Sequence, residues 1–206
     1  MTTNVAIINY GLGNIRSLFN CLKKIDANPQ IINSPKELKK FNKIILPGVG
    51  SYKDAMKLIK KFGWDEGISD YLINKENQLF GICVGMQILS SFGLEYGKTK
   101  GLDIIDGEVQ DLAKFGCKLK LPHIGWNDIQ LENKSYITRG ISNNSCFYFV
   151  NGYAFNLKNK NNLIATVNYD IKFPAIIEKD NVVGTQFHPE KSSKAGYQIL
   201  KNFLNA

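Results

Sequence analysis

The sequence is poor in the residues that build metal sites. Its only histidines, His123 and His188, stand far apart in the chain. No carboxylate or cysteine cluster lies at ligand spacing around either of them, and the cysteines form no C-x-x-C pair. Because protein zinc sites combine His, Cys and carboxylate ligands at short spacing, we expect no bound metal.

The sequence also lacks a recognisable targeting or membrane segment. The apolar stretch at residues 5–8 begins after four residues and is too short to be the apolar region of a secretory signal. No apolar run approaches the roughly 18 residues that a membrane helix needs. Four scattered cysteines, Cys21, Cys83, Cys117 and Cys146, are typical of a reducing compartment. We therefore expect a cytoplasmic protein without a membrane partner.

Arginine is scarce although the chain is basic. Its 26 Lys and Arg against 18 Asp and Glu give a net charge of +8, but Arg16 and Arg139 are the only arginines. Bidentate recognition of bases and phosphates favours Arg. We therefore interpret the charge as solvated lysine surface and expect no nucleic-acid partner; the alternative is that part of it faces an acidic partner.

Apolar runs and helical spacing alternate in the first half of the chain. Strands are predicted at residues 5–8, 43–46 and 79–82, and helices at 15–25, around 55–59 and from 84 through 89. From about Gly107 short strand candidates follow, at 124–131, 146–155, 163–169, 175–178 and 182–187, before a terminal helix at 197–204. We expect one α/β domain over residues 1–206: an open mixed, largely parallel sheet flanked by helices, with a β-rich second half.

The strongest local signal is the segment Gly81-Ile82-Cys83-Val84-Gly85. Small residues on both sides of Cys83, between a strand and a helix, are typical of a nucleophile elbow, whose apex side chain is strained and exposed. Amides at the start of the following helix would favour the thiolate of Cys83. The alternative is a buried structural cysteine in a glycine-bordered turn.

A possible base for this cysteine lies near the end of the chain. His188 and Glu190 follow a strand, and side chains at i and i+2 of an extended segment point to the same side. Pro189 favours an extended conformation at His188, so both groups are presented together. His188 could accept the thiol proton while Glu190 fixes its tautomer, the logic of a catalytic triad.

A second glycine turn supplies candidate oxyanion donors. Pro47-Gly48-Val49-Gly50 follows a strand, as the elbow does, so both turns are expected at the carboxyl edge of the sheet. Backbone amides there, with the amide of Val84, could bind a developing oxyanion. Gly11-Leu12-Gly13 is not a dinucleotide fingerprint, because Arg16 replaces its last glycine.

Taken in order, these motifs resemble the class I (triad) glutamine amidotransferases, which are flavodoxin-like α/β proteins. Further motifs resemble a narrower family, the glutaminase subunits of imidazole glycerol phosphate synthases; these motifs are NYGLGN at 9–14, PHIGWN at 122–127, YFV at 148–150 and HPEKS at 188–192. The resemblance covers essentially the whole chain.

The resemblance implies a glutaminase that works without a cofactor. Cys83 would form a γ-glutamyl thioester from L-glutamine and release ammonia, with His188 and Glu190 completing the triad. Val49 and Val84 would supply oxyanion amides. The substrate pocket would include Gly48, Gly50, Gln87, Gly152 and Tyr153. Residues that match interface or gating positions toward a (β/α)8 cyclase partner in a heterodimer are Asn14, Trp126, Tyr148 and Lys191.

Two departures from this family leave the pathway open. Asn9 stands where the family usually has Asp, and Asn151-Gly152 stands where it usually has His followed by Ser or Thr. The leading interpretation is ammonia supply to imidazole glycerol phosphate and AICAR formation in histidine biosynthesis. The alternatives are a paralogue that supplies ammonia for amidination of a surface-polysaccharide or glycan sugar, and a catalytically silent binding or regulatory module.

Overall fold

A nine-stranded mixed sheet forms the centre of the computed structural model, which describes residues 3–206. Its strands, in spatial order, are β2 (Asn28–Ile32), β1 (Asn4–Ile8), β3 (Lys43–Gly48), β4 (Gln78–Cys83), β13 (Val182–Thr185), β12 (Ile171–Lys179), β11 (Leu163–Tyr169), β8 (His123–Leu131) and β9 (Cys146–Asn151). The neighbours from β2 to β13 are parallel, and those from β13 to β9 are antiparallel. The predicted mixed α/β sheet is confirmed.

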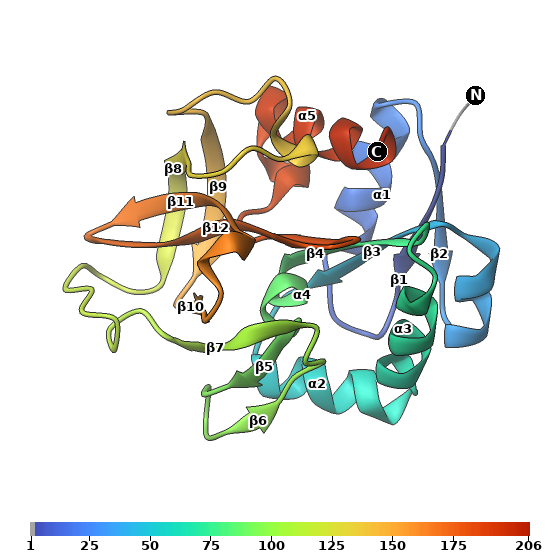
Figure 1. The fold of residues 1–206 in the computed structure, drawn as a ribbon, viewed down its shortest axis with the longest axis horizontal. Helices are drawn as coiled ribbons and strands as arrows, with labels where there is room; N and C mark the ends of the chain where they lie inside the picture. Colours follow the sequence, from blue (N-terminus) through green and yellow to red (C-terminus); the bar gives the residue numbers. More distant parts are fainter. Residues whose placement is uncertain (1–2) are drawn as a thin grey trace.

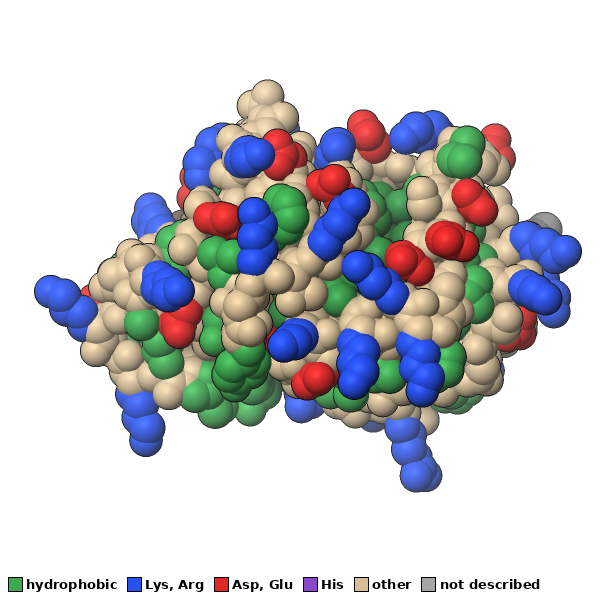
Figure 2. Space-filling model, turned by 90° about the horizontal axis from the view of Figure 1, so that it is seen from below, with side chains coloured by type: hydrophobic (Ala, Val, Ile, Leu, Met, Phe, Trp, Pro, Cys, Tyr) green, Lys and Arg blue, Asp and Glu red, His purple; other side chains and the backbone are tan. Residues whose placement is uncertain are grey.

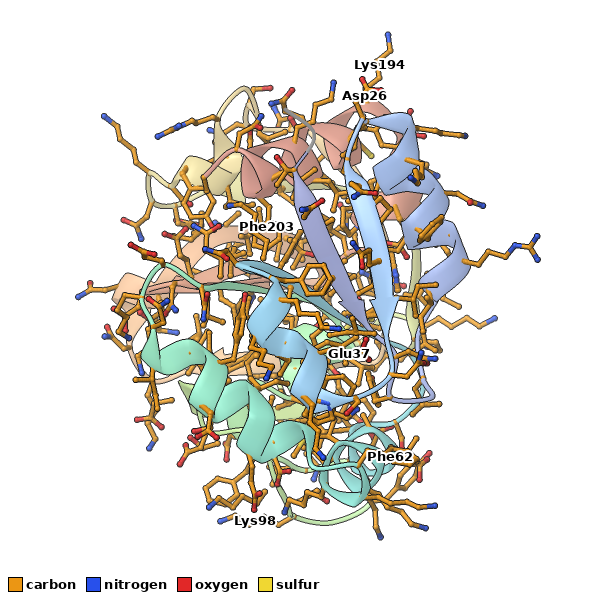
Figure 3. The ribbon with its side chains drawn as sticks, turned by 90° about the vertical axis from the view of Figure 1, so that its right-hand side faces the viewer. Asp26, Glu37, Phe62, Lys98, Lys194 and Phe203 are labelled. Carbon is orange, nitrogen blue, oxygen red and sulfur yellow. The ribbon has the colours of Figure 1, made fainter. Side chains whose placement is uncertain are left out.

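Helices cover both faces of this sheet (Figure 1). Helices α1 (Ile15–Lys24) and α5 (Ser193–Leu204) lie above it in that view, and α2 (Tyr52–Lys61) and α3 (Trp64–Ile73) lie below. Each helix buries one apolar stripe, as on α5, where Phe203 points toward the sheet (Figure 3). The Phe203 ring packs against the Phe80 ring of β4, with the two ring centroids 5.2 Å apart.

A smaller, four-stranded sheet lies beneath the large one (Figure 1). Its strands, in order, are β10 (Tyr153–Leu157), β7 (Ile105–Asp111), β5 (Ser90–Gly93) and β6 (Thr99–Lys100). The single strand predicted at 146–155 was therefore wrong: β9 ends at Asn151 in the large sheet, and β10 begins at Tyr153 in the small one. Periodicity did not reveal the break at Gly152 because the apolar pattern continues across it.

The helix predicted from Val84 through Leu89 is also shorter than expected. Helix α4 (Val84–Gln87) makes one turn, and the chain then enters β5. Ile88 and Leu89 are fully buried, so their apolar spacing reflects passage through the core rather than a helix face. Only the amides of that one turn, rather than a full helix dipole, can therefore act on Cys83.

The carboxyl edge of the parallel strands brings the predicted motifs together. Gly48 at the end of β3 pairs with Cys83 at the end of β4, and Thr185 of β13 pairs with Ile82. The PGVG turn, the cysteine elbow and the segment that carries His188 therefore leave the sheet side by side. This edge is where open α/β sheets place their sites.

The charged surface has no uniformly basic face in the view from below. Figure 2 shows Lys and Arg interspersed with Asp and Glu over the face made by α2, α3 and the small sheet. This mixture agrees with the interpretation of the net charge as solvated surface. In the described part of the chain, no helix is long and apolar enough to span a bilayer.

Candidate active site

Cys83 stands at the apex of a strained turn between β4 and α4. Its φ of 55° and ψ of −112° are unfavourable for a residue with a side chain, as an elbow requires. The flanking glycines permit close packing: a Cβ at Gly81 would meet the Gly85 carbonyl oxygen at 2.7 Å, and one at Gly85 would meet the Leu46 carbonyl oxygen at 1.8 Å. The predicted elbow is present.

The expected exposure of the apex side chain was wrong. Cys83 is only 4% exposed, because β9 and the segment after β13 pack over it. It still reaches a ligand-sized space, since it lines a pocket of about 420 Å³. Entry of a substrate therefore passes through this pocket rather than across an open surface.

His188 and Glu190 form a buried pair beside Cys83. The imidazole Nδ1 lies 3.0 Å from Oε1 of Glu190, with both side chains at most 5% exposed. His188 also interacts with Cys83, and because its Nδ1 is engaged by Glu190, Nε2 is the ring nitrogen left for the sulfur. Burial by itself lowers the pKa of His188, but the hydrogen bonds to Cys83 and Glu190 and their charges outweigh it and raise the pKa to about 10. The raised pKa favours a protonated imidazole between Cys83 and Glu190.

The two histidines are expected to titrate in opposite directions. Burial lowers the pKa of His123, whereas the pKa of His188 is raised. Imidazole NMR between about pH 5.5 and pH 9 should show His188 protonated and His123 neutral over most of that range. Because the folded pKa of His188 exceeds the unfolded value, its contribution to stability is present below about pH 6.5 and is lost as pH rises through about 10.

Cys83→Ala provides the control for this titration. It removes one hydrogen-bonding partner of His188, so the pKa of His188 should fall while that of His123 stays unchanged. Two histidines that both titrate near the ordinary value of about 6.5 would contradict the assignment.

The pocket next to Cys83 contains most of the substrate residues expected from the sequence. Its lining combines residues from both sheets and the loops between them: Gly50, Cys83, Val84, Gln87, Glu95, Asp111, Ala113, Leu121, Pro122, Val150, Asn151, Gly152 and Tyr153. Gly48 lies behind this wall and packs closely against α4. A Cβ added at Gly48 would lie 2.6 Å from the Gly85 amide nitrogen. Val49, which follows it, is 36% exposed at the same edge.

The expected interface residues fall into one cluster and one separate position. Trp126 of β8 packs edge-on against Tyr148 of β9 with centroids 6.0 Å apart, and Lys191 Nζ lies 5.7 Å from the Tyr148 ring. The Tyr148 carbonyl accepts a hydrogen bond of 3.0 Å from the amide of His188, which ties this cluster to the triad. Asn14 precedes α1, next to Gly13, which packs against the Pro47 ring.

The two departures from the family pattern occupy different places. Asn9 lies at the end of β1, where its Nδ2 donates to Asn33 Oδ1 at 2.8 Å, away from the pocket lining. Asn151 is buried in the pocket wall, and its Nδ2 donates to the Tyr153 carbonyl at 3.1 Å. The second departure therefore changes the pocket itself.

Two residues of the site were missed by sequence reasoning. Glu95, in the loop after β5, lines the pocket and accepts a 2.6 Å hydrogen bond from the Tyr52 amide. Gln186 is fully buried and contacts Cys83. Alternation back from His188 could have revealed Gln186 two residues earlier, and no local signal marked Glu95. The extended segment expected from His188 to Glu190 was wrong, because Pro189–Lys191 forms a 3-10 turn that brings the Glu190 carboxylate to His188.

Comparison with known proteins places the chain in a family. The model of the family "Glutamine amidotransferase class-I" matches residues 6–206. Imidazole glycerol phosphate synthase subunit HisH of Caldanaerobacter subterraneus is 43% identical over 199 residues, covering 97% of this chain and 96% of the relative. The HisH subunit of Pelagibacter ubique is 40% identical over 208 residues, covering 98% and 99%.

Solved structures show the same fold at lower identity. A crystal structure of a glutamine amidotransferase aligns with a TM-score of 0.77 at 17% identity, over 98% of this chain and 97% of that one. The structure of PurLQS from Thermotoga maritima contains a chain that aligns with a TM-score of 0.76 at 21% identity, over 100% and 99%.

The fold, the cysteine elbow and the family match define a class I glutamine amidotransferase, an enzyme with glutaminase activity. Within this class the near full-length relatives are HisH subunits. The chain belongs to the HisH family of imidazole glycerol phosphate synthase subunits.

Proposed function

We propose that this chain is the glutaminase subunit of an imidazole glycerol phosphate synthase and that Cys83, His188 and Glu190 are its catalytic triad. It hydrolyses L-glutamine and passes the ammonia to a cyclase subunit that forms imidazole glycerol phosphate and AICAR in histidine biosynthesis. The observation that carries the proposal is that His188, hydrogen-bonded to Glu190, interacts with Cys83, which lines a pocket, in a chain related to HisH over nearly its full length.

The reaction proceeds in two acyl-transfer steps. The Cys83 thiolate attacks the side-chain amide carbon of glutamine, and the C–N bond breaks as His188 gives its proton to the departing nitrogen. Ammonia leaves and a γ-glutamyl thioester remains. His188 then takes a proton from water, which attacks the thioester; the C–S bond breaks, and glutamate and the thiolate–imidazolium pair are restored. Glu190 keeps the imidazole oriented throughout.

Backbone amides stabilise the oxyanion of both tetrahedral intermediates. We assign this role to the amides of Val49 and Val84, the residues that follow the paired Gly48 and Cys83 at the sheet edge. Gly50, Gln87, Gly152 and Tyr153 then hold the substrate within the pocket, with Gly48 supporting its wall.

The pocket has the size and charge that a free amino acid needs. Its volume of about 420 Å³ accommodates a small molecule, and the carboxylates of Glu95 and Asp111 suit an α-ammonium group. Burial raises the pKa of Glu95, while its hydrogen bond from Tyr52 lowers it in part. A bound ammonium group would stabilise the charged form of this carboxylate.

The partner is a (β/α)8 cyclase subunit that forms a heterodimer with this chain. Trp126 and Ile124 present apolar surface on β8, at 54% and 60% exposure, next to Tyr148 and Lys191. We assign these positions and Asn14 to the docking and gating face. The hydrogen bond between His188 and Tyr148 would carry a change at that face to the triad.

We further propose one domain over residues 1–206 and a cytoplasmic location. The family match from residue 6 to residue 206 supports the single domain. The four cysteines are all free thiols, which suits a reducing compartment.

Activity in the complex is expected to depend on the cyclase and its ligand. Glutamate release by the purified chain, by the heterodimer and by the heterodimer with the ligand of the cyclase should rise in that order, the last step by at least about tenfold. No glutaminase activity in any of the three states would contradict the proposal.

The glycan-amidination alternative rests on the altered pocket wall at Asn151-Gly152. A heterodimer whose glutaminase activity does not change with the cyclase ligand but increases with an amidotransferase acting on sugars would favour that paralogue. The double variant Asn151→His and Gly152→Ser gives the pocket wall the residues usual in the family, and it separates an effect of the pocket from an effect of the partner. If this chain works with a different partner, the cyclase ligand will still fail to stimulate the double variant.

A further inference from the structure

Gln186 is a fully buried amide that the triad chemistry described above does not use. It follows β13, and its backbone amide donates to the Ala175 carbonyl at 2.9 Å. Its side chain turns back toward the elbow, where Nε2 lies 3.7 Å from Cys83 Sγ. A buried amide directed at a nucleophile needs an explanation, because its polar atoms were removed from water.

The sulfur of Cys83 has two further polar neighbours besides His188. The Val150 carbonyl oxygen, at 3.8 Å, can only accept a hydrogen bond, so it favours the protonated thiol. Gln186 Nε2, at 3.7 Å, can only donate, so it favours the thiolate. The two contacts act in opposite directions on the same atom, and both are long for a sulfur hydrogen bond.

The orientation of the Gln186 amide is determined by its neighbours. Gln87 Nε2 donates to the Tyr153 carbonyl at 3.1 Å, which requires the nitrogen of Gln87 on that side. The same nitrogen donates to Gln186 Oε1 at 3.0 Å. Gln186 must therefore present its oxygen to Gln87 and its nitrogen to Cys83. A backbone carbonyl of the pocket wall thus fixes, through two glutamines, which group faces the sulfur.

We propose that Gln186 is a positioning residue that holds the Cys83 thiolate by its side-chain N–H group, in an orientation set by Gln87. This inference rests on the proposed function and deepens it. Gln87 then has a second role besides lining the pocket, because a substrate that engages it also acts on the amide that contacts the nucleophile.

The pH dependence of Cys83 alkylation tests this role in the full chain. The other titratable groups near the sulfur are His188 with its partner Glu190, Tyr10 after β1, and the pocket residues Glu95, Asp111 and Tyr153. Gln186→Glu keeps the shape but replaces the N–H donor with an oxygen. The midpoint for iodoacetamide reaction should rise by about one pH unit, which is a tenfold shift of the thiol–thiolate equilibrium toward the thiol.

Mass spectrometry of the Cys83 peptide separates its alkylation from that of Cys21, Cys117 and Cys146. In the heterodimer, Gln186→Glu should lower kcat about tenfold, with a smaller effect on KM because Gln186 lies behind the pocket wall. Gln198→Glu makes the same chemical change on α5, where Nε2 donates to Asn202 Oδ1, and should leave both the midpoint and kcat unchanged.

Gln186→Met removes the donor without burying a charge and replaces Gln186→Glu if that variant unfolds. An alkylation midpoint equal to that of the unsubstituted chain in either folded variant would overturn the inference. If that occurs while Cys83→Ala still abolishes glutamine hydrolysis, only the role of Gln186 fails. If Cys83→Ala leaves hydrolysis unchanged, the proposed function fails.

Discussion

Replacing Cys83 with alanine is expected to reduce glutamate release from the ligand-stimulated heterodimer by about 10⁴- to 10⁶-fold. The reason is that the first acyl-transfer step has no other thiol available. The three remaining cysteines lie elsewhere in the fold, with Cys21 and Cys117 buried and Cys146 half-buried at the start of β9. Stopped assays with glutamate detection, at saturating glutamine, measure this loss.

Cys146→Ala is the matched control for that prediction. It removes a thiol of the same size outside the pocket, and activity should stay within about twofold. Both variants should unfold at nearly the temperature of the unsubstituted chain, so that lost activity is not lost structure. Residual activity in Cys83→Ala above about one percent would exclude Cys83 as the nucleophile and would mean that glutamine is hydrolysed by a different mechanism.

The chemistry of the site was predictable because its residues lie next to backbone signals. Cys83 stands between two glycines at the end of a strand, and His188 and Glu190 are two residues apart around a proline. These short-range patterns identified the residues, although Pro189–Lys191 forms a 3-10 turn rather than the extended segment expected. Glu95 was not predictable, since its place in the pocket depends on β5 and β6, two short strands without clear alternation.

The fold was predictable where the spacing of apolar residues stayed the same throughout a helix or strand. Strands β3, β4 and β11 lie where their apolar runs indicated. The errors at α4 and at Gly152 share one physical cause: at both places the chain passes from one sheet to the other without an exposed turn. Hydrophobic periodicity shows which side chains of a segment are buried, but it does not show that the chain has moved from one sheet to another.

Replacing Gly85 with alanine is expected to destabilise the chain by more than about 4 kcal/mol, enough to prevent recovery of folded protein at 37 °C. A Cβ at this position would lie 1.8 Å from the Leu46 carbonyl oxygen, an atom of β3 that cannot rotate away. Strand β3 and helix α4 would have to separate, which also moves Gly48 away from Cys83. Chemical denaturation followed by tryptophan fluorescence measures this loss, since Trp64 is fully buried.

Gly152→Ala distinguishes this clash from a general cost of replacing glycine. A Cβ there would lie 3.7 Å from the Pro122 side chain, an ordinary contact, so the free energy of unfolding should change by less than about 1 kcal/mol. If Gly85→Ala were as stable as Gly152→Ala, the close approach of α4 to β3 would be wrong. Gly85 would then be needed only for the backbone turn after Cys83. The proposal that the amides of Val49 and Val84 lie together as oxyanion donors would lose its structural basis.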